Sequence, residues 1–78
     1  MVFQKIADIL AEIIEEDSED ITPETPLTKA SGFEALQMAK LVMACEGRFK
    51  VTIHDEDILS FKCVQDLVEY IERILSDK

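Results

Sequence analysis

The stretch Gly32-Phe33-Glu34-Ala35-Leu36, followed by Leu41-Val42-Met43-Ala44, decides how this chain is expected to fold. Its apolar residues recur at helical spacing and predict one amphipathic helix over about residues 32–48. Ser31 and Glu34 stand three residues apart, which is the spacing of a capping box at the first turn of a helix. The predicted buried stripe of this helix consists of Leu36, Ala39, Val42, Met43 and Phe49.

Three further segments show helical patterns on either side of this stretch. Residues 2–15 and 63–76 predict two long helices, and residues 55–59 predict a single turn with acidic residues at its N-terminal end. Residues 16–31 have no helical pattern and contain both prolines. We therefore expect an all-α fold, a small antiparallel four-helix bundle with three long helices and one short helix, as a single domain over residues 1–78.

Four isolated apolar residues in the connecting segments are expected to dock on the core. A loop as long as residues 16–31 is uncommon in a compact domain unless it is pinned down, and Ile21 and Leu27 are the candidates for this role. Val51 and Ile53 alternate like a short strand, but no second strand is predicted to pair with them. We interpret them as core residues within a loop.

The composition excludes several classes of function. Seventeen acidic residues against eight basic ones give a net charge of −9, which disfavours nucleic acid because phosphate binding requires clustered Lys and Arg. Basic surfaces of partner proteins fit this charge better. No apolar run approaches the roughly 20 residues that span a bilayer, and residues 1–4 do not begin like a signal peptide. Two isolated cysteines make no disulfide framework, so we expect a protein of the reduced cytoplasm, and a monomer.

The order and spacing of these segments resemble the acyl carrier protein family over nearly the whole chain. The segments that carry the resemblance are residues 21–27, 32–36, 41–49, 51–57 and 64–71. The resemblance implies a carrier bundle in which a serine at the start of the second long helix holds 4'-phosphopantetheine, and the thiol of this arm carries an acyl group. It also implies contacts with proteins of fatty-acid or polyketide-type biosynthesis.

The attachment position is where this chain departs from the family pattern. Gly32-Phe33-Glu34-Ala35-Leu36 resembles the family's Gly-x-Asp-Ser-Leu, with Ala35 in the place of the serine. Alanine has no hydroxyl, so no phosphodiester can form at Ala35, and the chain as written takes no cofactor. Ser31 carries the nearest hydroxyl, but its predicted capping role explains it without chemistry.

The expected docking surface departs from the family as well. Family members carry exposed acidic residues on this helix, which contact basic patches of partner enzymes. Residues 31–53 instead hold three basic and two acidic residues, a charge of +1, which leaves −10 for the rest of the chain. Steering toward the usual partners would be weaker as a result. The partner-docking surface that the resemblance implies consists of Phe33, Glu34, Leu36, Gln37, Met38, Lys40 and Arg48.

Two functions remain open on the sequence. The first is an acyl carrier protein-like protein that is not phosphopantetheinylated and acts by protein-protein contacts in a lipid or polyketide pathway. The alternative is an ordinary acyl carrier presented as a Ser-to-Ala form at position 35, with 4'-phosphopantetheine on a native serine. An enzyme is not supported, because the sequence shows no nucleophile-base pair, no metal-ligand spacing and no phosphate-binding loop.

The remaining reactive or adaptable side chains are interpreted as structural. We expect His54 at or near the surface, Cys45 in the core, and Cys63 half-buried at the start of the last helix, where the helix dipole would favour a thiolate. Met43 is expected in the core and Met38 at an exposed contact. The acidic runs 15–20 and 55–57 are expected to be solvated, with weak binding of divalent cations at most and no metal site.

Overall fold

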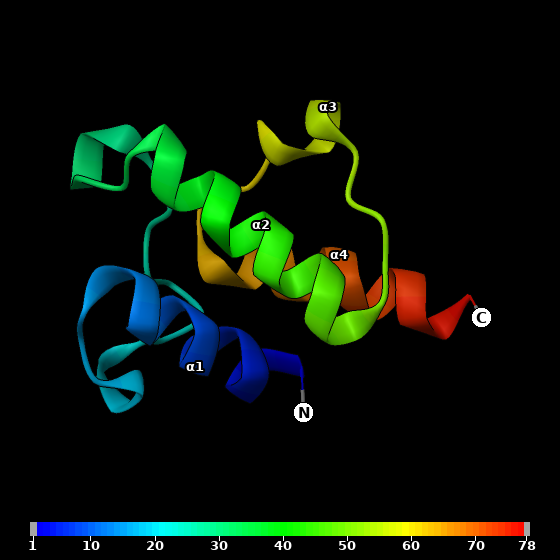
Figure 1. Ribbon diagram of the computed structural model, residues 1–78, viewed down its shortest axis with the longest axis horizontal. Helices are drawn as coiled ribbons and strands as arrows, with labels where there is room; N and C mark the ends of the chain where they lie inside the picture. Colours follow the sequence, from blue (N-terminus) through cyan, green and yellow to red (C-terminus); the bar gives the residue numbers. More distant parts are fainter. Residues whose placement is uncertain (1, 78) are drawn as a thin grey trace.

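Four α-helices make up the fold. The computed structural model describes residues 2–77, and at Ser31 the backbone alone. The helices are α1 (Val2–Ile14), α2 (Ala35–Phe49), α3 (Asp55–Ile58) and α4 (Val64–Ser76), and short 3₁₀ turns lie at Ser18–Asp20 and Lys29–Ser31. The described residues form no strand. α1 runs antiparallel to α2 and α4, and α3 lies in the connection from α2 to α4 (Figure 1). The predicted all-α fold with three long helices and one short helix is confirmed.

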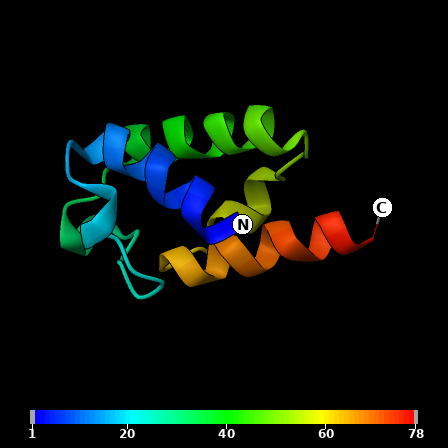
Figure 2. The ribbon, with the colours of Figure 1, turned by 90° about the horizontal axis from the view of Figure 1, so that it is seen from below.

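One hydrophobic core lies between the three long helices. α1 packs against both α2 and α4, and Figure 2 shows α1 between the other two. The largest fully buried side chains are Ile6, Leu10, Leu41, Cys45, Val64, Leu67 and Ile71. No polar or charged side chain of the described residues is buried, so apolar burial and close packing are the main source of stability. None of the described helices is long and apolar enough to cross a membrane.

The four apolar residues of the connecting segments dock on this core as predicted. Ile21 and Leu27 are 5% and 4% exposed, and Val51 and Ile53 are buried as well. The loop between α1 and α2 is therefore held at two points in its length, in agreement with the expectation that an unusually long loop must be pinned.

The same loop also caps α4. The N–H groups of Val64 and Gln65, which begin α4, donate to the carbonyls of Thr25 at 3.0 Å and Pro23 at 2.8 Å. The first N–H groups of a helix have no partner within the helix, and here the loop supplies two of the missing acceptors. The loop thus supplies acceptors to the start of α4 and also buries Leu27. These two contacts explain why it is ordered although it has no helical pattern.

The predicted start of α2 is wrong by three residues. α2 begins at Ala35, with Glu34 as the N-cap, and the Glu34 N–H donates to Gln37 Oε1 at 2.8 Å. In a capping box, a side chain three residues into the helix accepts a hydrogen bond from the N-cap N–H. Gln37 has this role here, whereas the sequence predicted Glu34 for it. Gly32 adopts φ 92° after the preceding 3₁₀ turn, a left-handed conformation that interrupts the helix and that glycine tolerates. The side chain of Ser31, to which the capping role was assigned, lies outside the described residues.

The predicted buried stripe of α2 is wrong at three positions. Leu36 is 67% exposed and Met43 is 70% exposed, and Ala39 is exposed too. The stripe that faces the core consists of Met38, Leu41, Val42, Ala44, Cys45 and Phe49. Apolar residues occur on both sides of α2, so helical spacing alone does not decide which side is buried. The side with Leu41 and Cys45 faces the core and α1, which leaves Met43 on the solvent side.

This rotation of α2 predicts a large effect for one truncation and almost none for another two residues away. Leu41→Ala should lower the free energy of unfolding by about 2–5 kcal/mol, because it empties a fully buried site. Met43→Ala should change it by no more than about 0.5 kcal/mol, as for other exposed positions. Urea denaturation followed by circular dichroism measures both in one helix. A large loss for Met43→Ala would show that the assigned rotation of α2 is wrong.

Candidate functional site

Ala35, the residue that the resemblance places at the attachment position, lies at an exposed helix start. Ala35 is the first residue of α2 and its side chain is exposed. The chain reaches it through a tight connection, in which the Gly32 N–H donates to the carbonyl of Lys29 at 3.0 Å and the Phe33 N–H to that of Thr28 at 3.1 Å. These bonds hold the residues before Ala35 in one conformation. Position 35 is therefore presented at the surface by a defined backbone.

An apolar groove adjoins this position between the start of α2 and the end of α3. It has a volume of about 330 Å³ and is lined by Phe33, Ala35, Met38, Ala39, Ile58 and Leu59, together with the charged Lys29 and Glu34. We call it the α2–α3 groove. Its volume is at the lower limit of small-molecule sites.

Phe33 stands between this groove and a second one. Its side chain is only 8% exposed, yet it lines both the α2–α3 groove and a space of about 340 Å³ beside Ile14, Gly32 and Gln37. The resemblance assigned Phe33 to the docking surface. In the structure it forms part of the floor of two surface grooves rather than a projecting contact.

The structure brings only part of the expected docking surface together. Phe33, Glu34 and Met38 share the α2–α3 groove, and Leu36 and Lys40 are exposed on α2. Gln37 is half-buried, and its side chain caps α2. Arg48 is exposed near the other end of α2, about 18 Å along the helix from Leu36 at 1.5 Å per residue.

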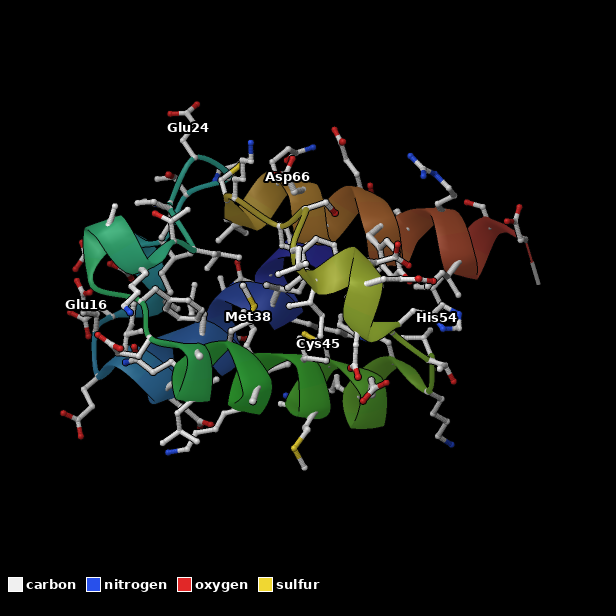
Figure 3. All side chains as sticks on the ribbon, turned by 90° about the horizontal axis from the view of Figure 1, so that it is seen from above. Glu16, Glu24, Met38, Cys45, His54 and Asp66 are labelled. Atoms are coloured by element: carbon white, nitrogen blue, oxygen red, sulfur yellow. The ribbon has the colours of Figure 1, made fainter. Side chains whose placement is uncertain are left out.

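The assignments of the two methionines are reversed. Met38, expected at an exposed contact, is half-buried against the core, and Met43, expected in the core, is exposed. Figure 3 shows Met38 and Cys45 pointing from α2 into the interior. Sequence reasoning also missed Leu59, which is 86% exposed and lines the α2–α3 groove. An apolar residue directly after an acidic helical turn was the available signal.

The α3 wall of the groove is tied to α4 by Tyr70. Its hydroxyl donates to Asp57 Oδ2 at 2.8 Å, and its ring makes an edge contact with Phe61, with ring centroids 5.2 Å apart. Ile58 and Leu59 follow Asp57 directly, so this bond helps to position the groove wall. Burial, and after it the hydrogen bond to Asp57, raise the pKa of Tyr70 above its ordinary value.

The other candidate side chains have structural settings. Burial, and after it the charge of Glu46, raise the pKa of Cys45 to about 12, so this thiol is not a nucleophile at neutral pH. Cys63 is half-buried and is the N-cap of α4. Its N–H donates to Asp66 Oδ2 at 3.3 Å. His54 is exposed at the edge of the molecule, before α3 (Figure 3). Within residues 2–77, no cluster of three His, Cys, Asp or Glu side chains could hold a metal ion.

Comparisons with known proteins agree with this architecture. A family profile described as "Phosphopantetheine attachment site" matches residues 4–71. An acyl carrier protein of Aster yellows witches'-broom phytoplasma is 37% identical over 73 residues, which cover 94% of this chain and 96% of that protein. One of Syntrophobacter fumaroxidans is 41% identical over 69 residues, covering 88% and 85%. One of Clostridium perfringens is 36% identical over 70 residues, covering 90% and 92%.

The chain therefore belongs to the acyl carrier protein family, whose members carry a 4'-phosphopantetheine group. Proteins of this family are carriers and not enzymes, and they work with the enzymes of acyl-transfer pathways. At the position that the resemblance assigns to the attachment serine, the residue present does not fit a covalent arm, however. Ala35 offers a methyl group where a phosphodiester requires a hydroxyl oxygen, so no chemistry through that group follows from this site.

The Tyr70–Asp57 bond predicts a small, pH-dependent contribution to stability. Tyr70→Phe should lower the free energy of unfolding by about 1 kcal/mol at neutral pH, the usual worth of one hydrogen bond. Because the pKa of Tyr70 is raised in the folded state, its contribution is present below the ordinary tyrosine pKa of about 10 and is lost as pH rises through the folded value. Urea denaturation between pH 7 and pH 11 measures the difference between the two proteins. A difference that does not shrink at alkaline pH would contradict this account.

The burial of the two thiols predicts that they react at different rates. In the native protein, Cys63 should react first with a thiol reagent, whereas Cys45 should react only when the core opens, because it is fully buried. Cys63→Ala should remove the fast phase, and urea should expose both thiols. Rapid labelling of Cys45 in the folded Cys63→Ala variant would contradict the packing of α2.

Proposed function

We propose that this chain is an acyl carrier protein-like protein that carries no phosphopantetheine and acts by protein contacts in a lipid or polyketide pathway. The observation that carries the proposal is an exposed alanine at the first residue of α2, in a domain that otherwise matches the family from residue 4 to residue 71. The position is presented as a carrier would present it, yet it has no oxygen to modify.

The surface around this position supports a role in protein contacts. Leu36 is largely exposed beside Ala35 and Ala39, and the α2–α3 groove opens next to them. Lys40 and Arg48 are exposed where acidic residues are expected in a carrier. Basic residues at these positions disfavour the basic patches of the usual partner enzymes and favour partners with a different charge pattern. We propose Glu34, Leu36, Gln37, Met38, Lys40 and Arg48, over the floor residue Phe33, as the contact surface.

The retained geometry also favours a second candidate. Because Ala35 lies at an exposed helix start beside an apolar groove, a serine there would be accessible for modification. An ordinary carrier whose natural residue 35 is serine would hold 4'-phosphopantetheine at this point, and its acyl chain would enter between the apolar stripes of the helices. For either candidate we propose the cytoplasm as the setting, since both cysteines are free thiols.

The intact mass of the protein from its native host tests the proposal. The mass should equal that encoded by a gene with alanine at codon 35, with no added group. A serine codon and the mass of one phosphopantetheine would establish the ordinary carrier instead. An added arm on the unaltered sequence would contradict both readings and would require the modified residue to be mapped.

Substitution at position 35 then tests the surface. Ala35→Ser should accept one phosphopantetheine from a broad-specificity transferase, because the helix start is exposed and ordered. The double variant with Ser31→Ala should be modified equally, and Ser31→Ala alone should not be modified. Failure of Ala35→Ser to accept the arm while it remains folded would show that the recognition surface has diverged along with the serine.

A further inference from the structure

One aromatic ring separates the two surface grooves at the start of α2. The α2–α3 groove, of about 330 Å³, lies on the α3 side of Phe33. The other groove, of about 340 Å³, lies on the α1 side, and we call it the α1–α2 groove. Besides Phe33 its lining includes Ile14, Glu16, Thr25, Pro26 and Gln37. Among the described residues that line the two grooves, Phe33 alone is common to both.

The half-buried surroundings of this ring are apolar on both of its sides. Ile14 in the α1–α2 groove, and Met38 and Ile58 in the α2–α3 groove, are partly buried against the core cluster that contains Phe33. The charged residues that line the grooves are all exposed, namely Glu16, Lys29 and Glu34. A path from one groove to the other through the place of the ring would therefore be apolar in its interior.

The backbone before α2 holds the ring in this place. The Phe33 N–H donates to the carbonyl of Thr28 at 3.1 Å, and the Gly32 N–H donates to that of Lys29 at 3.0 Å. Gly32 has a φ of 92°, which sets the direction in which the chain enters Phe33. The ring is only 8% exposed, so turning it out of the core would expose an apolar surface to water. Phe33 is therefore a fixed partition between the grooves.

We propose that the ring of Phe33 is an internal plug. It occupies an apolar site at the start of α2 that would otherwise admit an apolar ligand, and it divides this site into two grooves. Each groove alone is at the lower limit of small-molecule sites, whereas the two joined would lie well inside the usual range of roughly 300–1,000 Å³. Phe33 thereby keeps the interior of this bundle closed to ligands.

The ligand that the plug excludes is an elongated apolar group without charge. It must be elongated because the joined site would run from the α1 side of Phe33 to its α3 side. It must be uncharged where it replaces the ring, since a charge buried among Ile14, Met38 and Ile58 would have no partner. The net charge of −9 also repels small anions from the whole molecule.

Phe33→Ala tests the plug, because it removes the ring and leaves one methyl group between the grooves. The probe is N-phenyl-1-naphthylamine, an uncharged apolar dye whose fluorescence rises when it leaves water. The unaltered chain should bind the dye weakly, since neither groove can enclose it. Phe33→Ala should bind it at least about tenfold more tightly, because a site that encloses most of a ligand's surface replaces two open grooves.

Phe61→Ala is the matched control. Phe61 is 4% exposed in the same core, but it lies at another groove, beside Tyr70 and Arg73, and does not line either groove at the start of α2. Its variant loses the same ring and should bind the dye about as weakly as the unaltered chain. Circular dichroism shows whether both variants are folded. Phe33→Leu and Phe61→Leu repeat the comparison with a smaller change in volume, which cores tolerate better.

The methyl signals of Ile14 and Ile58 in NMR spectra locate the bound dye. Both should shift when Phe33→Ala binds it, because one isoleucine lines each groove. The proposal is overturned if only one of them shifts, if the unaltered chain binds the dye as tightly as Phe33→Ala, or if the Phe61 variants gain as much affinity as the Phe33 variants. None of these results bears on the arm at position 35, which the intact mass decides, so the plug and the proposed function fail separately.

Discussion

The burial of Leu41, Val42 and Cys45 in the core, where α2 packs against α1, sets the rotation of α2, and the rest of the molecule depends on that rotation. A helix that carries apolar residues on two sides can bury either one. Once the core takes the side with Leu41, the opposite side, with Leu36 and Met43, must face solvent. The exposed position of Ala35, the α2–α3 groove and the exposure of Leu36 and Met43 all follow from this one choice of packing.

The short helix α3 depends on its neighbours rather than on itself. Four residues make one helical turn, which is far below the length at which a helix is stable alone. The acidic first turn suits the helix dipole, but the position of α3 is set by the bond from Tyr70 to Asp57 and by the packing of Phe61 against Tyr70. Because Ile58 and Leu59 form one wall of the α2–α3 groove, the shape of that groove depends on contacts made by α4.

Much of the fold could be predicted from the sequence, because most of it depends on local pattern. α1 and α4 have one apolar stripe each, so their boundaries and buried faces follow from helical spacing, and Ile21, Leu27, Val51 and Ile53 stand out as isolated apolar residues in polar surroundings. The rotation of α2 could not be predicted, since Met38 and Met43 both fit a helical stripe and only the tertiary packing distinguishes them. The start of α2 was missed because Gly32 adopts a left-handed conformation that a capping motif does not reveal.

The lack of a hydroxyl at Ala35 and the exposure of Met43 have a common consequence for what α2 can do. In a protein that presents a bound arm, the start of this helix must remain accessible to the enzymes that load and unload it, and a permanent partner on α2 would compete with them. Under the proposed function this chain has no arm and therefore no such requirement. Its exposed apolar residues at positions 36 and 43 are then available to a partner, and covering them would remove apolar surface from water. Their place on α2, the helix where the charge of −9 is locally balanced, is consistent with a contact surface for a partner protein.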